Sequence, residues 1–172
     1  MRLTKDIYEL RAIELAPKFL GMELCRRLLN GEVIRQKITE TEIYYGEDDT
    51  ACHAHKGKTK RTSTMYESGG FAYIYLCYGI HNLLNIVTGI KDFPEAVLIR
   101  GTEDFNGPGK LTKAMSINMG LNKENLTISD RLWIEDVGIK CKYTKEKRVG
   151  IAYADQADQD RLWRFTAKEF TK

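Results

Sequence analysis

The sequence predicts an α+β fold: one compact domain with a curved, mostly antiparallel β-sheet, surrounding helices and a protruding β-hairpin. Runs rich in aromatic and β-branched residues recur along the chain, and two pairs of runs are joined by short turns. The 172 residues have 42% hydrophobic content and contain no repeat or low-complexity linker. A chain of this length and composition is expected to bury one core, as a single domain over residues 1–172.

The first third of the chain predicts a helix followed by a hairpin. Apolar residues recur at helical spacing from Tyr8 to Phe19, and Gly21 is a natural end for that helix. Two extended runs then flank Asn30-Gly31 in ELCRRLLNGEVIRQKITETEIYY. Because both residues tolerate the positive φ of a tight turn, this dipeptide predicts a β-hairpin.

The remaining elements follow from shorter patterns. GEDD ends the second strand, and Asp49 or Thr50 could cap a short helix over residues 51–55. The run FAYIYLCYGIHNLLNIVTG predicts a second hairpin that turns at residues 78–81, and EAVLIRG predicts a buried strand. KLTKAMSINMG is expected to be a helix that ends at Gly120. The last expected strands are LTISDRLWIEDV, RVGIAYA and LWRFTAKEF.

Composition predicts a soluble, cytoplasmic protein, associated with the nucleoid if the source is bacterial. The N-terminal MRLTKDIYELRAIELAPKFLG mixes charges through its apolar positions, unlike a signal peptide, and no run approaches the roughly 20 apolar residues of a membrane span. No membrane partner is therefore expected. The four cysteines are scattered without a C-x-x-C pair, so free and mostly buried thiols are favoured: Cys25, Cys52, Cys77 and Cys141.

Residues 40–55, ETEIYYGEDDTACHAH, hold an unusual density of acids, tyrosines and histidines. On a strand, alternate side chains share a face, which places Ile34, Ile38, Glu40, Glu42 and Tyr44 together. A carboxylate beside an aromatic ring on a partly buried strand suggests a pocket in which desolvation raises the carboxyl pKa. An edge strand with its acids in water explains the pattern equally well.

The same stretch offers potential metal ligands, but their spacing argues against a metal site. His53 and His55 are two residues apart and would point to different sides of a helix, and Cys52 is directly adjacent to His53. No second cluster of histidine or cysteine follows, and His81 stands alone. We expect neither a dedicated metal site nor a cofactor.

Two further patterns are suggestive. Tyr73 and Tyr75 share a face of the second hairpin, where core packing is the ordinary explanation, whereas the ring of Tyr78 at the turn has little to pack against. KGKTKR then places four cations within six residues: Lys56, Lys58, Lys60 and Arg61. Such a run is more often a solvated loop than a binding site, and the net charge of +3 is too small to decide.

Seven ordered pieces of the chain resemble the alkyladenine (3-methyladenine) DNA glycosylase family. They are ETEIYYGEDDTACHAH, TKRTSTMY, AYIYLCYGIHNLLNIV, AVLIRG, NGPGKLTKAM, RVGI and WRF, and they extend over nearly the entire chain. The resemblance implies an enzyme that removes damaged purines from duplex DNA, such as 3-methyladenine, 7-methylguanine, hypoxanthine and ethenoadenine. A monomer is the default expectation for a small glycosylase.

The resemblance assigns roles in base flipping. A glycosylase must extrude its target nucleotide from the helix, and a side chain fills the gap that is left. By similarity, Tyr78 is that wedge, and Tyr44, His53 and Tyr75 sandwich the flipped base. Alkylation gives a purine positive charge, which aromatic faces attract.

The resemblance also assigns the chemistry and the selectivity. Glu42 matches the general base that activates water, while Arg100 and the main-chain carbonyl of Val149 match groups that hold this water and carboxylate. Asn85 matches the residue that rejects the exocyclic amine of guanine. The main-chain amide of His53 would donate to the six-position acceptor of hypoxanthine or ethenoadenine. No lysine nucleophile is implied, so the expected product is an intact abasic site.

With a DNA site adjacent, the basic loop becomes a candidate for phosphate contact, together with Lys110 and Lys113 in GPGKLTK. Two departures from the family pattern put the damage range and affinity in doubt: MYESGG replaces M-F-x-x-P-G, and residues 100–106 form a short segment.

Two other functions remain open. One is a metal-dependent phosphodiesterase that uses residues 40–55, and the other is a damage-binding module without catalysis.

Overall fold

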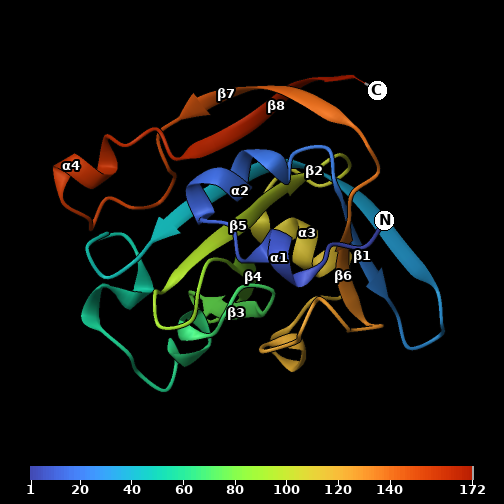
Figure 1. The fold of residues 1–172 in the computed structure, drawn as a ribbon, viewed down its shortest axis with the longest axis horizontal. Helices are drawn as coiled ribbons and strands as arrows, with labels where there is room; N and C mark the ends of the chain where they lie inside the picture. The colour runs from blue at the N-terminus through green and yellow to red at the C-terminus, as the bar shows by residue number, and fades with distance from the viewer. Residues whose placement is uncertain (172) are drawn as a thin grey trace.

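A computed structural model describes residues 1–171, and its long central strand β2 (Val33–Tyr45) organises the sheet (Figure 1). The other strands are β1 (Glu23–Arg27), β3 (Ala72–Cys77), β4 (His81–Val87), β5 (Glu95–Thr102), β6 (Leu132–Glu135), β7 (Lys140–Glu146) and β8 (Arg164–Thr171). The helices are α1 (Lys5–Tyr8), α2 (Ala12–Lys18), α3 (Pro108–Ala114) and α4 (Gln156–Gln159), with 3₁₀ turns η1 (His53–Lys56), η2 (Ser63–Tyr66) and η3 (Met119–Leu121).

The strands form a curled sheet in the order β3-β4-β5-β2-β1-β6, with β8 paired to both β2 and β7. The first part of β2, residues 33–37, pairs with β1, and residues 38–45 pair with β5. Residues 40–42 also pair with β8. All strand pairs among residues 1–171 are antiparallel, which confirms the predicted α+β class.

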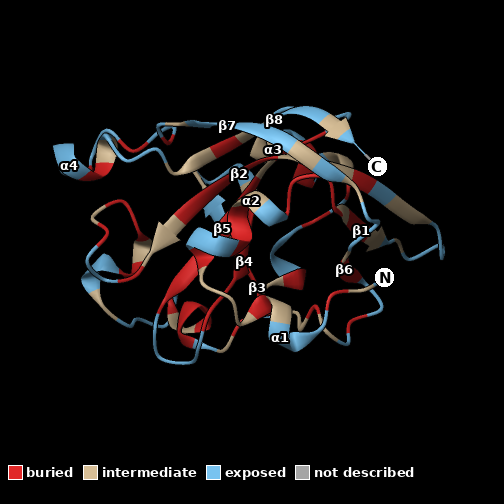
Figure 2. Cartoon of the chain, turned by 45° about the horizontal axis from the view of Figure 1, so that its top comes forward, coloured by how far each residue is buried: buried red, intermediate tan, exposed pale blue. Residues whose placement is uncertain are grey.

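The main core lies between the sheet and its helices. Thr41 Oγ1 of β2 donates to the carbonyl oxygen of Ala16 in α2 at 2.9 Å, and Leu15 of the same helix packs in one buried cluster with Ile43 and Val97. Burial is concentrated in the centre of the fold, whereas β7 is exposed along most of its length (Figure 2). Neighbouring side chains of β2 thus alternate between this core and the opposite face, which Glu42 and Tyr44 share.

Both predicted hairpins are confirmed, because their turn signals are local. The predicted N-terminal helix is wrong in extent, since it is broken into α1 and α2. The carbonyl of Tyr8, which a continuous helix would pair with the Ala12 N–H, accepts from the Gly89 N–H instead. Ala12 N donates to the buried carboxylate of Glu95 at 3.0 Å. These tertiary contacts replace the helical bonds and fix the break.

Four other segments also differ from prediction. RVGIAYA is a loop rather than a strand, and β7, which pairs with β8, was not predicted. The predicted helix 110–120 begins earlier, with Pro108 in its first turn, and ends at Ala114. The short helix predicted over residues 51–55 is instead the 3₁₀ turn η1, which begins at His53.

The predicted shared face of β2 is only partly correct. Ile38 and Ile43 are an odd number of residues apart, so regular alternation would place them on opposite faces, yet both belong to the main core. Glu42 lies on the other face. The register between β2 and β5 is irregular on both sides of Glu40, and such irregularities redirect side chains. Separately, none of the helices described in residues 1–171 has the length and apolar character required for a membrane span.

Candidate active site

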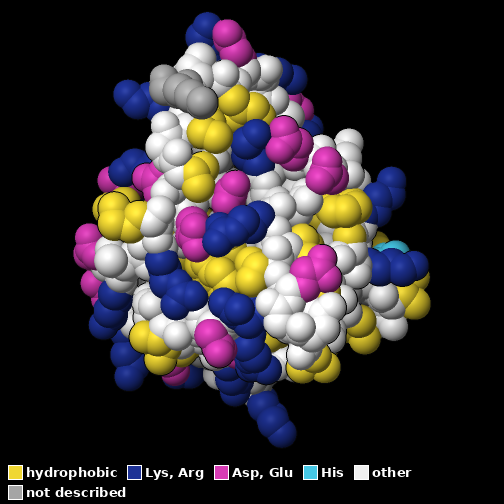
Figure 3. All heavy atoms as spheres, turned by 90° about the vertical axis from the view of Figure 1, so that its right-hand side faces the viewer, with side chains coloured by type: hydrophobic (Ala, Val, Ile, Leu, Met, Phe, Trp, Pro, Cys, Tyr) yellow, Lys and Arg dark blue, Asp and Glu magenta, His cyan; other side chains and the backbone are white. Residues whose placement is uncertain are grey.

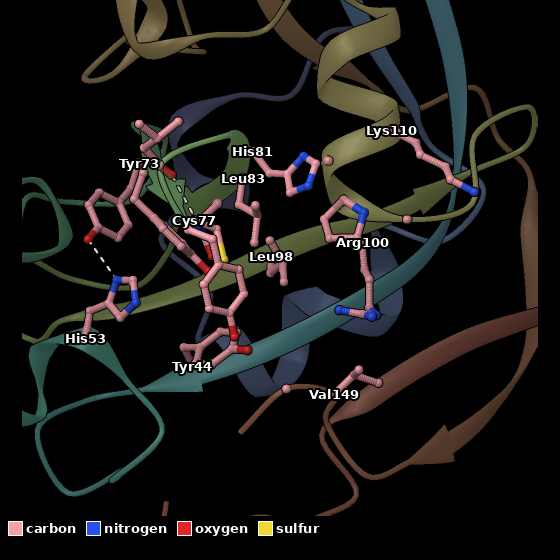
Figure 4. Close-up of a pocket in the computed structure, with 18 of the residues that line it drawn as sticks. Tyr44, His53, Tyr73, Cys77, His81, Leu83, Leu98, Arg100, Lys110 and Val149 are labelled. Atoms are coloured by element: carbon pink, nitrogen blue, oxygen red, sulfur yellow. Dashed lines mark hydrogen bonds between the residues drawn. The ribbon is translucent and has the colours of Figure 1, made fainter. Parts of the chain in front are cut away.

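The face of the sheet opposite α2 carries a cavity of about 710 Å³. β2, β3, β4 and β5 supply its walls, together with the start of α3 and the loop after β7 (Figure 4). The lining is mostly aromatic and apolar, with a few convergent polar groups, which is typical of a ligand site. The predicted site residues that line it are Tyr44, His53, Arg61, Tyr75, Tyr78, Asn85, Arg100, Lys110 and Val149.

Glu42 lies directly behind the lining of this cavity, and its side chain is 0% exposed. The backbone N–H of Val149 donates to Oε1 at 2.8 Å, and the Tyr44 hydroxyl donates to Oε2 at 3.0 Å. Arg100 Nε lies 3.7 Å from Oε1. Three groups that line the cavity therefore hold this carboxylate, each from a different segment of the chain.

Burial and the neighbouring groups shift the pKa of Glu42 in opposite directions, with a net rise. Burial raises its pKa above the ordinary value, while Arg100, the Val149 amide and the Tyr44 hydroxyl oppose that rise. Burial also raises the pKa of Tyr44 well above 10, so this hydroxyl keeps its proton and remains a donor. A carboxylate with a raised pKa beside a cavity suits a general base.

The aromatic wall consists of His53 and two tyrosines of β3. The His53 ring packs edge-on against Tyr75, with centroids 4.4 Å apart, and its Nδ1 lies 3.0 Å from the Tyr73 hydroxyl (Figure 4). Burial, and secondarily the cation Arg61, lowers the pKa of His53 to about 4. The imidazole is therefore neutral at pH 7, which removes one repulsive charge against a cationic base.

Asn85 and two leucines lie deeper in the cavity. Asn85 is buried, and its Nδ2 donates to the Tyr73 carbonyl at 3.2 Å, which fixes its amide. Leu83 on β4 and Leu98 on β5 complete an apolar floor, and Asn85 and Leu98 are ladder partners. One polar group in such a floor can discriminate ligands through a hydrogen bond or a clash.

Tyr78 occupies the tip of the hairpin between β3 and β4, as predicted, and is 92% exposed. Its φ is 51° and that of Gly79 is 71°. A bulky residue at positive φ is uncommon because its side chain crowds the backbone. An exposed ring held in this conformation contributes little to stability.

The predicted cations are only partly gathered at the cavity. Arg61 and Lys110 line it, and the Arg61 guanidinium carbon lies 5.6 Å from the Tyr75 ring centroid. The other four are exposed and are not among the lining residues: Lys56, Lys58, Lys60 and Lys113.

The ligand-type residues of 40–55 have separate partners. Asp49 pairs with Arg148, His53 contacts Tyr73, and the Nδ1 of His55 lies 2.6 Å from the carbonyl oxygen of Glu47. Glu40 is bound by two arginines, Arg100 and Arg164. Free thiols are confirmed at all four cysteines, of which only two are fully buried.

One other group of ligand atoms comes together in the described chain, on β1 and β6. The side chains of Glu23, Cys25 and Glu135 lie within 4.8 Å of one another. Arg35 Nη1 contacts all three, at 3.1, 3.3 and 2.8 Å respectively. A guanidinium thus already occupies the position that an ion would take. This side of the fold mixes acidic and basic side chains around apolar ones (Figure 3).

Sequence reasoning missed two residues of the site. The Arg148 side chain is 0% exposed, pairs with Asp49 at 2.6 Å, and places its guanidinium carbon 5.1 Å from the Tyr44 ring centroid, so it packs against Tyr44. Tyr153 lines the cavity and donates to the Ala51 carbonyl at 2.7 Å. Both lie in the loop that was predicted to be a strand, and nothing in RVGIAYA distinguishes them.

Comparisons with known proteins identify the family of the chain. The model of the methylpurine-DNA glycosylase family matches residues 6–105 and 102–171. A protein of Borreliella burgdorferi (strain ZS7) is 40% identical over 92% of this chain and 91% of its own length. A protein of Rickettsia rickettsii (strain Sheila Smith) is 43% identical over 78% of this chain and 75% of its own length. Both are named "Putative 3-methyladenine DNA glycosylase". The chain belongs to the methylpurine-DNA glycosylase family.

Proposed function

We propose that this protein is a monofunctional DNA glycosylase of base-excision repair, which flips a damaged purine from duplex DNA into the cavity and hydrolyses its bond to the sugar. The observation that carries the proposal is Glu42. It is a fully buried carboxylate held by Val149 and Tyr44 directly behind an aromatic cavity. A pure binding module needs rings and positive charge, but it has no use for a desolvated base.

The proposed reaction is a displacement at the anomeric carbon. Water forms the new bond to this carbon and passes a proton to Glu42, while the electron pair of the glycosidic bond leaves with the purine. Positive charge that develops on the sugar is stabilised by the ionised carboxylate. Arg100 favours the ionised form of Glu42, and the Val149 carbonyl is proposed to orient the water.

The cavity also accounts for substrate choice. Tyr44 on one side and His53 with Tyr75 on the other provide aromatic faces for an alkylated purine, and the neutral His53 ring suits a cationic base. Asn85 is proposed to reject the exocyclic amine of guanine. Alkylated and deaminated bases also cost less to unstack than normal pairs.

The direct test is excision of hypoxanthine, ethenoadenine and 3-methyladenine from duplex DNA by the native protein in a chelator. We expect release of the free base and an intact abasic strand. Activity that requires a divalent ion would instead support a phosphodiesterase, and lesion binding without release would support a damage sensor. A covalent adduct trapped by borohydride would show lyase chemistry, for which Lys110 would be the first residue to examine.

Replacement of Tyr44 by phenylalanine tests the hydroxyl contact to Glu42 separately from the ring. The variant keeps the aromatic face but loses a hydrogen bond to an ionised group, which contributes roughly 1.5–3 kcal/mol. We expect single-turnover excision to fall on the order of 10-fold, with unchanged affinity for lesion duplex. Unchanged excision would show that Tyr44 acts only through its ring, and an equal loss in binding would show that the hydroxyl contributes to DNA affinity rather than to the chemical step.

Tyr78→Ala is expected to weaken binding of lesion duplex by on the order of 10-fold, because the gap left by the flipped nucleotide loses its aromatic filler. Stability should not change, since the ring is exposed. Leu29→Ala is the matched control, because Leu29 is a fully exposed apolar residue next to the tip of the other hairpin. Equal effects of the two variants on DNA binding would contradict the wedge assignment.

The basic loop is tested by salt dependence. Each phosphate contact contributes a slope of about 0.9 to the dependence of log affinity on log salt. The double variant Lys56→Gln/Lys60→Gln should therefore flatten this slope by up to about 2. The control Lys5→Gln/Lys18→Gln removes the same charge from α1 and α2. The loop would be a spectator if both double variants retained the native slope.

A further inference from the structure

We infer that Arg164, on β8, is a positioning residue for Glu42, and that it acts through two separate contacts. Its Nη1 lies 2.8 Å from Glu40 Oε1, and its Nε donates to the Lys147 carbonyl at 2.8 Å. A third contact, Nη2 to Glu146 Oε2 at 2.5 Å, anchors the guanidinium to the end of β7. The inference rests on the proposed function.

The first contact connects Arg164 to Arg100 through Glu40. Glu40 Oε1 accepts from Arg164 and also lies 3.3 Å from Arg100 Nε, which is 3.7 Å from Glu42 Oε1. Glu40 thus holds Arg100 between two carboxylates, and Arg164 in turn fixes Glu40. All four side chains are largely buried, so solvent screens these charges only weakly.

The second contact connects Arg164 to the loop that contains Val149. The Lys147 carbonyl that Arg164 binds is two residues before the amide that donates to Glu42. Arg164 is also the ladder partner of Glu42 between β8 and β2. The same guanidinium therefore ties the loop after β7 to the strand that carries the base.

Arg164 also balances charge. Glu40 disfavours the ionised form of Glu42, and a lone Arg100 would face two carboxylates if Arg164 were removed. The groups that act on Glu42 come from every element around it: Glu40 and Tyr44 of β2, Tyr75 of β3, Arg100 of β5, Arg164 of β8, and Arg148 and Tyr153 of the loop after β7. Loss of Arg164 is expected to raise the pKa of Glu42 further.

The test is single-turnover excision from lesion duplex between pH 5 and 9, together with duplex affinity. Arg164→Gln should lower the rate at pH 7 on the order of 10-fold and move the acidic limb of the profile to higher pH. Affinity should match that of Lys168→Gln, which removes one exposed cation from the same strand. In the Glu40→Gln background, Arg164→Gln should have a smaller effect, because the two residues act in one chain.

Arg164→Lys keeps the charge but not the three-pronged contact, so its acidic limb should stay near the native position while its rate falls. Arg164→Lys also tests the inference if Arg164→Gln fails to fold. The inference is overturned if Arg164→Gln behaves as Lys168→Gln does, if its acidic limb is unmoved, or if its effect is undiminished in the Glu40→Gln background. Excision by the native protein and its loss in Glu42→Gln would then still support the proposed function. Absence of excision by the native protein would overturn both.

Discussion

Glu42→Gln is expected to lower the single-turnover rate of base excision by about 10³-fold, because general-base catalysis and charge stabilisation both depend on the carboxylate. Binding of lesion duplex should persist, since Glu42 lies behind the wall and the aromatic faces remain. Excision time courses and gel-shift titrations on the same duplex measure the two quantities. A variant that excises at more than a tenth of the native rate would remove Glu42 from the chemistry.

The pH profile of the native protein follows from the same group. The base must be ionised, and burial raises the pKa of Glu42 above 4.5. Excision should therefore rise with pH through this raised pKa and be lost below it. The residual activity of Glu42→Gln should lack this acidic limb. Because burial disfavours the charged form, Glu42→Gln should also unfold at a temperature no lower than that of the native protein.

Asp49→Asn is expected to reduce the free energy of unfolding by about 3–5 kcal/mol, because it leaves the guanidinium of Arg148 buried without a counter-charge. The two side chains are 1% and 0% exposed, and Asp49 oxygens accept from both terminal nitrogens of Arg148, at 2.6 and 2.9 Å. Arg148 further donates to the carbonyls of Ile43 and Asp158, so it joins β2 to the loops around it.

Urea unfolding measures this effect. Glu169→Gln is the matched control, since it breaks an ion pair with Lys142 that is exposed on both sides, and such pairs contribute at most about 1 kcal/mol. A loss below about 1 kcal/mol for Asp49→Asn would mean that water reaches Arg148 and that this ion pair does not anchor the wall behind Tyr44.

Local signals predicted most of the sheet. Asn30-Gly31 and the turn at residues 78–81 fix their hairpins through backbone preferences that neighbouring residues determine. The break between α1 and α2 could not be predicted, because it depends on Gly89 and Glu95, more than 70 residues away. RVGIAYA has strand-like composition, yet long-range contacts of Arg148 and Val149 hold it as a loop.

The resemblance connected residues that spacing alone leaves apart, and the structure places most of them at or directly behind one cavity. Glu42 and Tyr44 could be placed on one face from strand periodicity, but nothing local brings Arg100 or Val149 to them. Arg148 was missed for a physical reason: an arginine in a loop is ordinarily exposed, and its burial depends on a partner at position 49 that sequence does not identify.

The most direct test is a crystal structure of Glu42→Gln bound to a duplex that contains one hypoxanthine or ethenoadenine. The account predicts the lesion base in the cavity, between Tyr44 and Tyr75, with Tyr78 in the gap of the helix and the sugar carbon facing position 42. A complex in which the lesion stays stacked within the duplex, or in which DNA lies on another face of the protein, would contradict it.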